Sequence, residues 1–412
     1  MSLIVIILIV LTAFALTDFL GPHNHRLHNQ IYYIALFVTF FLFTIKYCYG
    51  ADIAIYVPYY DELPTIRDLL HLERPDTLFE PGFNLFCFLL KSLGVSYWGM
   101  TAIISAIYFC ALNKLLKKIP EYRTFALCLI VCFDYNLIFA TFRQCLSVSF
   151  YILMYLAYTE KKTISMFLYM ILTCVMHKSG IFFGLPTFML LLTKDINIKK
   201  SSYTVLALLM ILALILPLKS SALALANIFS LNHDLYISID YHLSFTKKLQ
   251  VVLPIYLALF MSMSLMKNRA QFFGRMNLMI LLFTATIAAT YQFFPLLWRL
   301  RSYFMPLIIT YIFTTLYQFR QADNGDLDVS PFMTRNKKLL IPFTSALLLL
   351  FCVHTIMASQ KEHIRLKSRI YEACTIFDLR QYPEEKLVQR QLSRAKRYWK
   401  YEALDKDKVK LD

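Results

Sequence analysis

The sequence is poor in charged residues and in glycine. Asp, Glu, Lys and Arg make up 17% of its 412 residues and glycine occurs 9 times, whereas hydrophobic residues make up 58%. The mean hydropathy is +0.55, which leaves too few polar side chains to cover the surface of a water-soluble domain. The composition therefore excludes a soluble globular protein and predicts an integral membrane protein.

The sequence also lacks paired cysteine motifs and clusters of metal-ligating residues. Its 9 cysteines are scattered, mostly inside apolar runs, with no CxxC pair. We interpret them as small core residues and expect no disulfide, no metal and no cofactor. The net charge of +16 would suggest a nucleic-acid partner in a soluble protein. Here Lys and Arg lie largely between the apolar runs, so topology and lipid headgroups explain the charge and no nucleic acid is expected.

Apolar runs long enough to cross a bilayer recur along the chain. An α-helix rises about 1.5 Å per residue, so about 20 residues cross a hydrocarbon core of about 30 Å. The predicted fold class is all-α, a polytopic transmembrane helical bundle of about 12 spans. A shorter run at 81–93 is expected to form a half-helix or part of a broken span. The spans are expected near residues 3–20, 31–49, 97–113, 124–140, 143–159, 163–177, 179–193, 203–219, 249–266, 276–294, 301–319 and 339–358.

The placement of charge predicts the orientation of this bundle. Basic loops such as 114–123 and 161–162 are expected in the cytoplasm by the positive-inside rule. The acidic loop 50–80 and the segment 220–248 then lie on the outer side, and both termini come out external. Residues 1–358 form the predicted membrane domain. The tail 359–412 is basic and partly helical, a composition that favours the cytoplasm, so its side stays open.

Five ionisable residues lie at the ends of apolar spans, and with this topology all of them fall near the outer face. Ionisable groups in membrane segments cost roughly 2.5 to 3.5 kcal/mol each at a helix centre and usually mark a site. A snorkelling charge at a helix end is the alternative for any one of them. The five residues are Glu80, Arg143, His177, Arg299 and Arg301.

The residue types indicate an anionic ligand. Arginine keeps its charge and can donate two parallel hydrogen bonds to phosphate oxygens, so Arg143, Arg299 and Arg301 are candidates to bind a phosphate group. His177 could hold or release a proton near neutral pH, or it could be a buried structural histidine. Glu80 could act as a general base, could orient the basic groups, or could only cap the half-helix that follows it.

Aromatic residues near acidic side chains in the outer loops suit a sugar ligand. A flat ring can stack on the apolar face of a sugar while neighbouring polar groups bind its hydroxyls. Tyrosine also gathers at any membrane interface, and that alternative stays open. The candidate sugar-binding residues are Asp52, Tyr59, Tyr60 and Tyr241.

Several short motifs resemble the EpsG-like, Wzy-type polysaccharide polymerases. The order and spacing of the motifs cover residues 50–305, most of the bundle, and the C-terminal tail has no counterpart in this resemblance. Cys145 stands where the family often has alanine after the Arg-Gln pair. The motifs are ADIAIY at 51–56, EPGFNL at 80–85, FRQCL at 142–146, HKSG at 177–180 and WRLRSYF at 298–304.

The resemblance implies a metal-independent membrane glycosyltransferase of the bacterial inner membrane, with its active site facing the periplasm. Such an enzyme transfers a growing chain from undecaprenyl pyrophosphate to a new lipid-linked repeat unit, and so makes O-antigen or a related surface polysaccharide. Arg143, Arg299 and Arg301 would hold the pyrophosphate, with His177 or Glu80 acting on the acceptor hydroxyl. The expected partners are the lipid-linked oligosaccharide, membrane lipids, a chain-length regulator and a flippase.

Two rival functions share the outward-facing arginines. A flippase or transporter of lipid-linked sugars would also bind a pyrophosphate, although the sequence shows no internal repeat of the kind that transporters have. A lipid-carrier ligase or membrane acyltransferase would use similar chemistry. The sequence determines neither the sugars and linkage nor the oligomeric state.

Overall fold

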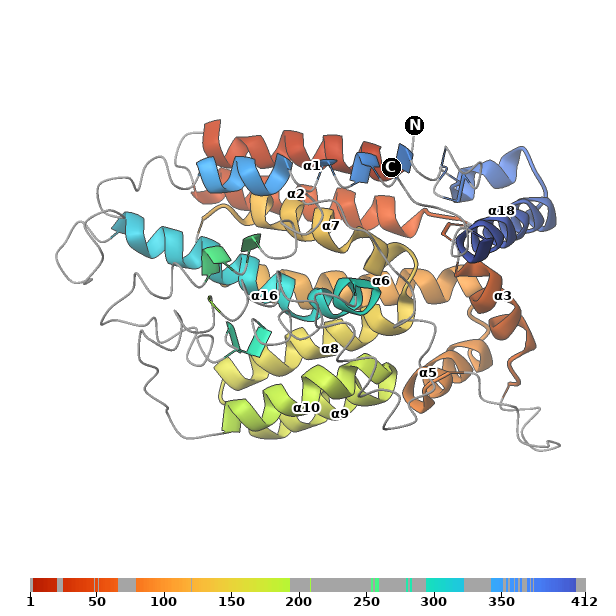
Figure 1. Ribbon diagram of the computed structural model, residues 1–412, viewed down its shortest axis with the longest axis horizontal. Helices are drawn as coiled ribbons and strands as arrows, with labels where there is room; N and C mark the ends of the chain where they lie inside the picture. Colours follow the sequence, from red (N-terminus) through yellow and green to blue (C-terminus); the bar gives the residue numbers. More distant parts are fainter. Residues whose placement is uncertain are drawn as a thin grey trace. The chain divides into compact units, whose positions relative to one another are not determined.

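The computed structural model describes residues 3–20, 25–47, 49–50, 52–65, 79–119, 121–192, 294–321, 342–350 and 374–404, together with scattered residues between 208 and 372. Every element in this part of the chain is helical, and its β-structure is limited to one isolated antiparallel bridge between Lys46 and Thr375 (Figure 1). The all-α prediction is therefore confirmed for the described residues.

The helices follow the predicted spans closely in the first half of the chain. Each predicted span from 3–20 to 179–193 corresponds to one helix, although the span predicted at 31–49 lies earlier in the chain, at His25–Thr44. The short run at 81–93 forms the separate helix α5. The helices of this half are α1 (Leu3–Leu20), α2 (His25–Thr44), α3 (Ile53–Glu62), α5 (Pro81–Ser92), α6 (Tyr97–Leu116), α7 (Arg123–Phe139), α8 (Phe142–Thr159), α9 (Thr163–Met176) and α10 (Lys178–Leu192).

The chain divides into two compact units. The first contains Met1–Lys117, Tyr122–Phe188 and Cys352–Lys408, and the second contains Lys118–Glu121, Met189–Phe351 and Val409–Asp412. Helix α16 (Phe294–Gln321) is the principal described element of the second unit. The predicted spans 203–219, 249–266 and 276–294 fall largely outside the described residues, whereas residues 342–350 of the predicted span 339–358 are helical. The total of about twelve spans stays a prediction.

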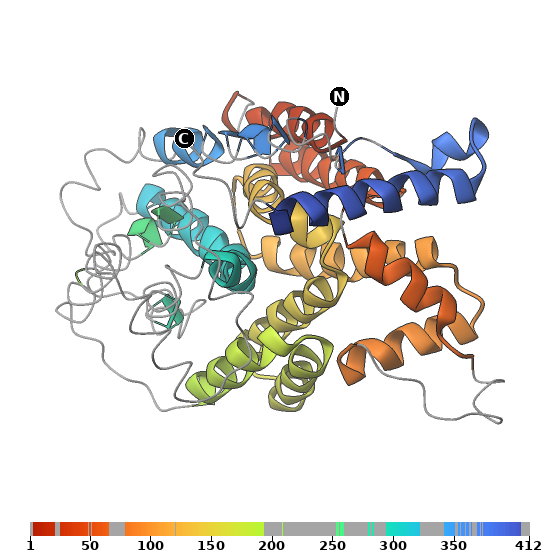
Figure 2. The same ribbon diagram turned by 45° about the vertical axis from the view of Figure 1, so that its right-hand side comes forward.

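Helix α7 forms the centre of the first unit. Nearly all of its side chains are buried, because α1, α2, α6 and α8 pack around it (Figures 1 and 2). A helix that is apolar on every side and enclosed by other helices is what a bundle core requires. Helix α9 packs on the outer side of α8, and α5 packs on α9.

Large hydrophobic side chains also cover the outside of the unit. Phe37 on α2, Ile164 on α9 and Phe182 on α10 are 66%, 79% and 72% exposed. Such apolar surfaces suit lipid rather than water. Among the described helices, residues 26–44 and 97–116 are long and apolar enough to cross a membrane, and 4–18, 163–176 and 178–192 are shorter apolar helices. The chain is therefore described as a helical membrane protein.

The loop predicted at 50–80 contains a helix that the sequence analysis missed. Ile53, Tyr56, Val57 and Tyr60 are all buried, and their spacing places them on one face of α3. This face packs against α6 and the C-terminal helix α18 (Glu384–Leu404). The sequence analysis treated 50–80 as an outer loop and did not anticipate a helix at Ile53–Glu62, because tyrosines that suggest a polar surface are here the apolar face of a helix.

Helix α5 begins and ends as the sequence predicts. Pro81 occupies its first turn, where its missing N–H costs nothing, and Glu80 is the extended residue before it. At the other end, the N–H of Gly94 donates to Lys91 O and that of Val95 donates to Leu90 O. Gly94 has φ +76°, the left-handed conformation that closes a helix.

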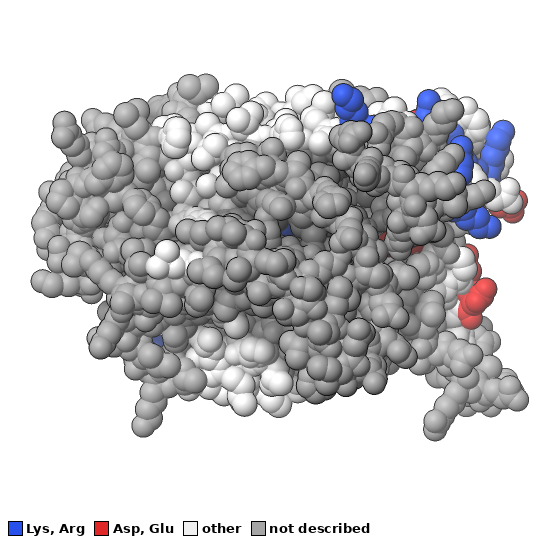
Figure 3. Space-filling view, viewed as in Figure 1, with Lys and Arg blue, Asp and Glu red and all other residues white. Residues whose placement is uncertain are grey.

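The C-terminal tail returns to the first unit. The sequence analysis expected this tail to be partly helical, and residues Glu384–Leu404 form α18, which packs on α3. On the face shown in Figure 3, described Lys and Arg side chains gather where Figure 1 labels α18, with Asp and Glu beside them. The tail thus contacts the end of the bundle where α2 ends and α6 begins.

Candidate functional site

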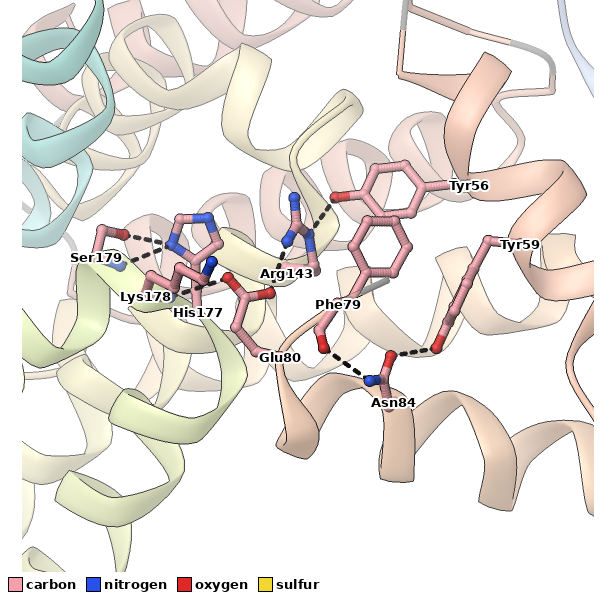
Figure 4. A network of polar contacts seen from close by, with 9 residues as sticks. All are labelled: Tyr56, Tyr59, Phe79, Glu80, Asn84, Arg143, His177, Lys178 and Ser179. Carbon is pink, nitrogen blue, oxygen red and sulfur yellow. Dashed lines mark hydrogen bonds and ion pairs between the residues drawn. The ribbon is translucent and has the colours of Figure 1, made fainter. Parts of the chain in front are cut away.

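An ion pair between Glu80 and Arg143 lies at this same end of the first unit. Arg143 Nη1 is 2.6 Å from Glu80 Oε2, and Arg143 Nε donates to the hydroxyl of Tyr56 at 3.1 Å (Figure 4). The guanidinium also lies over the ring of Phe79, 4.3 Å from its centroid. The guanidinium, carried by α8, is therefore held by two regions distant in sequence: α3 and the residues that precede α5.

The second oxygen of Glu80 binds the start of α10. Glu80 Oε1 accepts a hydrogen bond of 3.1 Å from the backbone N–H of Lys178, one of the amides that a helix leaves unpaired at its N-terminus. Burial alone raises the pKa of Glu80, but the positive charge of Arg143 and these hydrogen bonds outweigh it, so the pKa lies below its usual value. The carboxylate is ionised at neutral pH.

Two glycines allow these elements to approach. A Cβ on Gly82 would lie 2.6 Å from Val175 Cγ2 and 2.8 Å from Val175 O, so only glycine lets α5 reach the end of α9. A Cβ on Gly180 would overlap the carbonyl oxygen of Thr173 and lie 2.6 Å from Ser147 Oγ. The glycines of the EPGF and HKSG motifs are thus packing requirements of the site.

His177 is the extended residue between α9 and α10. Its φ of −157° and ψ of 137° end α9. The backbone N–H of Ser179 donates to Nδ1 at 3.1 Å, and the Ser179 hydroxyl lies 2.5 Å from the same nitrogen. A backbone N–H can only donate, so Nδ1 is an acceptor and the neutral ring carries its proton on Nε2. This tautomer presents a donor rather than a base.

Tyr59 and Phe79 form an aromatic wall beside the ion pair, and Asn84 bonds to both residues. The Tyr59 hydroxyl donates to Asn84 Oδ1 at 2.5 Å, and Asn84 Nδ2 donates to Phe79 O at 2.7 Å (Figure 4). The Tyr59 and Phe79 rings meet edge to face with centroids 4.5 Å apart. The polar contacts fix both Phe79, which covers Arg143, and Tyr59, which is half-buried.

The other candidate sugar-binding residues lie in different environments. Asp52 is the half-buried residue that precedes α3. Tyr60 is only 3% exposed and its hydroxyl donates to Val95 O at 2.8 Å. Tyr241 lies outside the described residues. A sugar-binding role for any of them stays a prediction.

Arg299 and Arg301 belong to the second unit. Both lie inside α16, which begins at Phe294, whereas the sequence analysis expected a span beginning at 301. Pro295, a favourable residue in a first turn, allows the helix to start earlier. Arg301 is 2% exposed, and the side chain of Arg299 lies outside the described set. The structure therefore brings together Glu80, Arg143 and His177 in the first unit. Arg299 and Arg301 belong to the second unit.

Sequence reasoning missed several polar residues that the structure places near the site or in the core. Tyr56, the last residue of the ADIAIY motif, was not among the candidate site residues. Lys46 is 4% exposed and Asp134, in the middle of α7, is 1% exposed with the Tyr108 hydroxyl 3.4 Å from its carboxylate. Each is a charged residue inside an apolar run, so the rule that singled out Arg143 could have found them.

Arg143 has the properties of an anion-binding group. Its side chain is 26% exposed, and its Nη2 makes no hydrogen bond to any residue that the structure describes. A guanidinium held on one side by Glu80 and Tyr56 can donate from its other side to phosphate oxygens. The described residues contain no group of three or more His, Cys, Asp or Glu placed to hold a metal ion, and metal independence stays a prediction.

Comparison with known proteins identifies the family. The model of the EpsG family matches residues 30–327, well over half of the chain, and includes every residue of the Glu80, Arg143 and His177 site. No curated protein and no solved structure shows a significant match. The chain therefore belongs to the EpsG family, and this membership indicates a membrane protein with a polysaccharide-polymerase-like role.

Proposed function

We propose that the protein polymerises lipid-linked oligosaccharide repeat units into O-antigen or a related surface polysaccharide. The growing chain passes from undecaprenyl pyrophosphate to the non-reducing end of a new lipid-linked unit. The observation that carries this proposal is Arg143, held at a bundle end by Glu80 and Tyr56 and still partly exposed. Family membership supports the polymerase class.

The reaction needs cations more than it needs a base. The bond between the anomeric carbon and the pyrophosphate oxygen breaks, and a bond from that carbon to the acceptor hydroxyl oxygen forms. Negative charge develops on the leaving oxygen, and a preorganised guanidinium stabilises it. Arg143 is the proposed primary contact, with Arg299 and Arg301 as further pyrophosphate-binding residues.

The two candidate acid–base residues receive different roles in this proposal. A carboxylate with a lowered pKa is a weak base, so Glu80 orients Arg143 instead of deprotonating the acceptor. His177 donates a hydrogen bond from Nε2 to the pyrophosphate. The acceptor proton passes to an oxygen of the departing pyrophosphate, which gains negative charge as the glycosidic bond breaks.

The distribution of basic residues supports an outward-facing site in the bacterial inner membrane. Lys114, Lys117 and Arg123 lie at the end of α6 and the start of α7, and Lys161 and Lys162 lie between α8 and α9. These termini are opposite to the ones that carry Arg143 and His177, because each helix crosses the unit once. The positive-inside rule then favours a periplasmic site. Tyr59 and Asp52 are proposed to contact the sugar.

A gel of surface glycan tests the proposal. Cells that lack the protein should show single repeat units, and wild-type complementation should restore a ladder of longer chains. Complete absence of repeat units in the deletion would contradict polymerisation and indicate export or ligation, while an intact ladder would indicate an acyltransferase. The chain-length regulator and flippase expected as partners must be present in the same cells.

A further inference from the structure

The C-terminal segment 374–394 extends beyond the matched family region and contacts the chain beside Arg143. Its first residues pair with the residues that follow α2. The N–H of Tyr47 donates to Cys374 O at 2.8 Å, and the N–H of Ile376 donates to Ile45 O at 2.9 Å. Residues 45–47 and 49–50, here called the bridging segment, thus pair with the tail along the chain.

A buried glutamine strengthens this contact. Gln391 of α18 is 1% exposed, and its Nε2 donates to Gly50 O at 3.1 Å and to Ile370 O at 2.9 Å. The N–H of Gly50 in turn donates to Ile370 O at 3.2 Å. One side chain therefore closes a network between the tail and the end of the bridging segment, in an environment where an unpaired polar group is costly.

A second contact joins the tail to α6. Trp98 Nε1 donates to Glu384 Oε1 at 2.9 Å, and the Trp98 ring lies 3.8 Å from the ring of Tyr47 in the bridging segment. The hydrogen bond from Trp98 lowers the pKa of Glu384. The start of α18 is therefore linked to the bridging segment through Trp98, as the middle of α18 is through Gln391.

The side chain of Lys46, in the bridging segment, contacts the end of α7 and the residue before Arg143. The Lys46 ammonium donates to Ile138 O, in the last turn of α7, at 2.6 Å. It lies 5.2 Å from the ring centroid of Phe139 and 4.8 Å from that of Phe142. A cation at a helix C-terminus binds carbonyls that the helix leaves unpaired and is favoured by the helix dipole.

The contact continues from Phe142 to the guanidinium. Phe142 precedes Arg143, and its ring lies 5.3 Å from that of Tyr56, whose hydroxyl accepts from Arg143 Nε. The cavity beside Lys46 measures about 10 Å³, enough for about one water. The cavity beside Lys46 is therefore too small for a substrate, so the role of Lys46 lies in its contacts with other protein residues.

We propose that Lys46 is a positioning residue for Arg143 and that the C-terminal segment 374–394 holds it in place through the bridging segment. The tail is then a part of the active-site framework. This inference rests on the proposed function, because it assigns a role relative to the polymerisation site.

Two matched substitutions test the proposal. Lys46→Met keeps the length of the side chain and removes its charge and donors, and Gln391→Met does the same for the buried amide. The probe is the lipid-linked repeat unit extracted from deletion cells, supplied to purified protein in lipid vesicles. We expect kcat to fall about tenfold to a hundredfold in each variant, as for a small displacement of a reacting group, with KM near wild type.

Stability measurements separate positioning from a merely structural role. We expect the thermal unfolding midpoints of both variants to stay within about 5 °C of wild type. Unchanged kcat per folded molecule, with only the midpoint lowered, would overturn the proposal. The control Gln389→Met changes an exposed residue of the same helix and should turn over as wild type.

A double variant tests whether both residues act along one path. Lys46→Met combined with Gln391→Met should be no slower than the slower single variant, because the second change breaks a contact that is already ineffective. A loss equal to the product of the single losses would contradict a common path. If Lys46→Met does not fold, Glu384→Ala replaces it: Glu384→Ala should be slower than Glu384→Gln, which keeps an oxygen to accept from Trp98, and equal rates would overturn the role of the tail.

The same assay distinguishes this inference from the function on which it rests. Wild-type protein that makes no polymer from the extracted repeat units contradicts the proposed function. Wild-type protein that polymerises, together with Lys46→Met and Gln391→Met variants of equal kcat, contradicts only the positioning role.

Discussion

The two ends of the first unit use charged residues in different ways. At the end away from Arg143, the Asp18 carboxylate accepts from the backbone N–H of Phe125 at 2.9 Å, in the first turn of α7. Nearby, Arg123 Nη1 donates to Asn29 Oδ1 at 2.7 Å and its Nη2 to Lys117 O at 3.3 Å. These groups connect neighbouring helix ends to one another.

At the other end, the carboxylate of Glu80 is used to hold a charge. Glu80 is 7% exposed and orients Arg143, whose side chain is 26% exposed, while Phe79 covers one face of the guanidinium. A buried carboxylate that fixes a partly exposed cation is an arrangement suited to a ligand. The comparison teaches that the partner of a charged residue, more than its presence at a helix end, separates structural from functional groups.

The largest expected difference between the two ends is in polymerisation when one arginine is removed at each end. Arg143→Ala should lower polymerisation at least about a hundredfold, because the charge that develops on the pyrophosphate loses its cation. Arg123→Ala should leave polymer length unchanged and lower only stability. Surface glycan gels and protein levels in the membrane check both, and normal chain length in the Arg143→Ala strain would contradict the site. Arg143→Lys should recover little activity, because a point charge lacks the planar fork.

A smaller loss of activity is expected when the carboxylate of Glu80 is neutralised, and no loss of activity when that of Asp18 is neutralised. Glu80→Gln keeps the shape and an acceptor for Lys178 N–H but loses the charge that orients Arg143, so kcat should fall about tenfold or more, the cost of a misplaced group. Asp18→Asn should lower the thermal midpoint without changing kcat. Vesicle polymerisation assays with both proteins check this, and equal activity of Glu80→Gln and wild type would remove the orienting role.

A loss of about fivefold is expected from the tyrosine beside the guanidinium. Tyr56→Phe removes only the acceptor of Arg143 Nε, a hydrogen bond to a partly exposed charged group worth about 1 kcal/mol. Its counterpart is Tyr32→Phe, which removes the 3.0 Å bond to Asn113 Oδ1 near the other end and should not change the rate. Equal rate losses in the two variants would erase the distinction between the ends.

The smallest expected effect is the change that mild acid makes to the stability contributed by the Glu80 ion pair. The pKa of Glu80 is lowered in the folded protein, so the stability that its ion pair contributes is complete above the ordinary glutamate pKa of about 4.3. This stability is lost only as the pH falls through the lower folded value. The difference in unfolding midpoint between wild type and Glu80→Gln should therefore stay constant from pH 7 to about pH 5 and shrink below it. A difference that shrinks already near pH 6 would show that the pKa is raised.

The sequence predicted those features that depend on short stretches of chain. The apolar runs gave α1, α2 and α6 to α10, and Pro81 and Gly94 gave the bounds of α5. Residues 53–62 were missed, because their apolar face is built from tyrosines and becomes recognisable only when α6 and α18 cover it. The start of α16 was also placed too late.

For the site, the sequence identified Glu80, Arg143 and His177 as charged groups in an apolar chain but could not assign their roles. The reason is that each role depends on a partner far away in sequence. Glu80 orients instead of accepting a proton because Arg143 lies 2.6 Å away. His177 presents a donor because Ser179 N–H occupies its Nδ1.

By itself the sequence determined that this protein is helical, lies in a membrane and carries arginines suited to an anionic ligand, because hydropathy and residue chemistry are local properties. Only the tertiary structure decided that Glu80, Arg143 and Tyr56 meet, that two glycines permit this approach, and that the tail contacts the segment beside Lys46. Those contacts join residues as far apart as Gly50 and Gln391. Their formation depends on how helices pack, which no short stretch of sequence encodes.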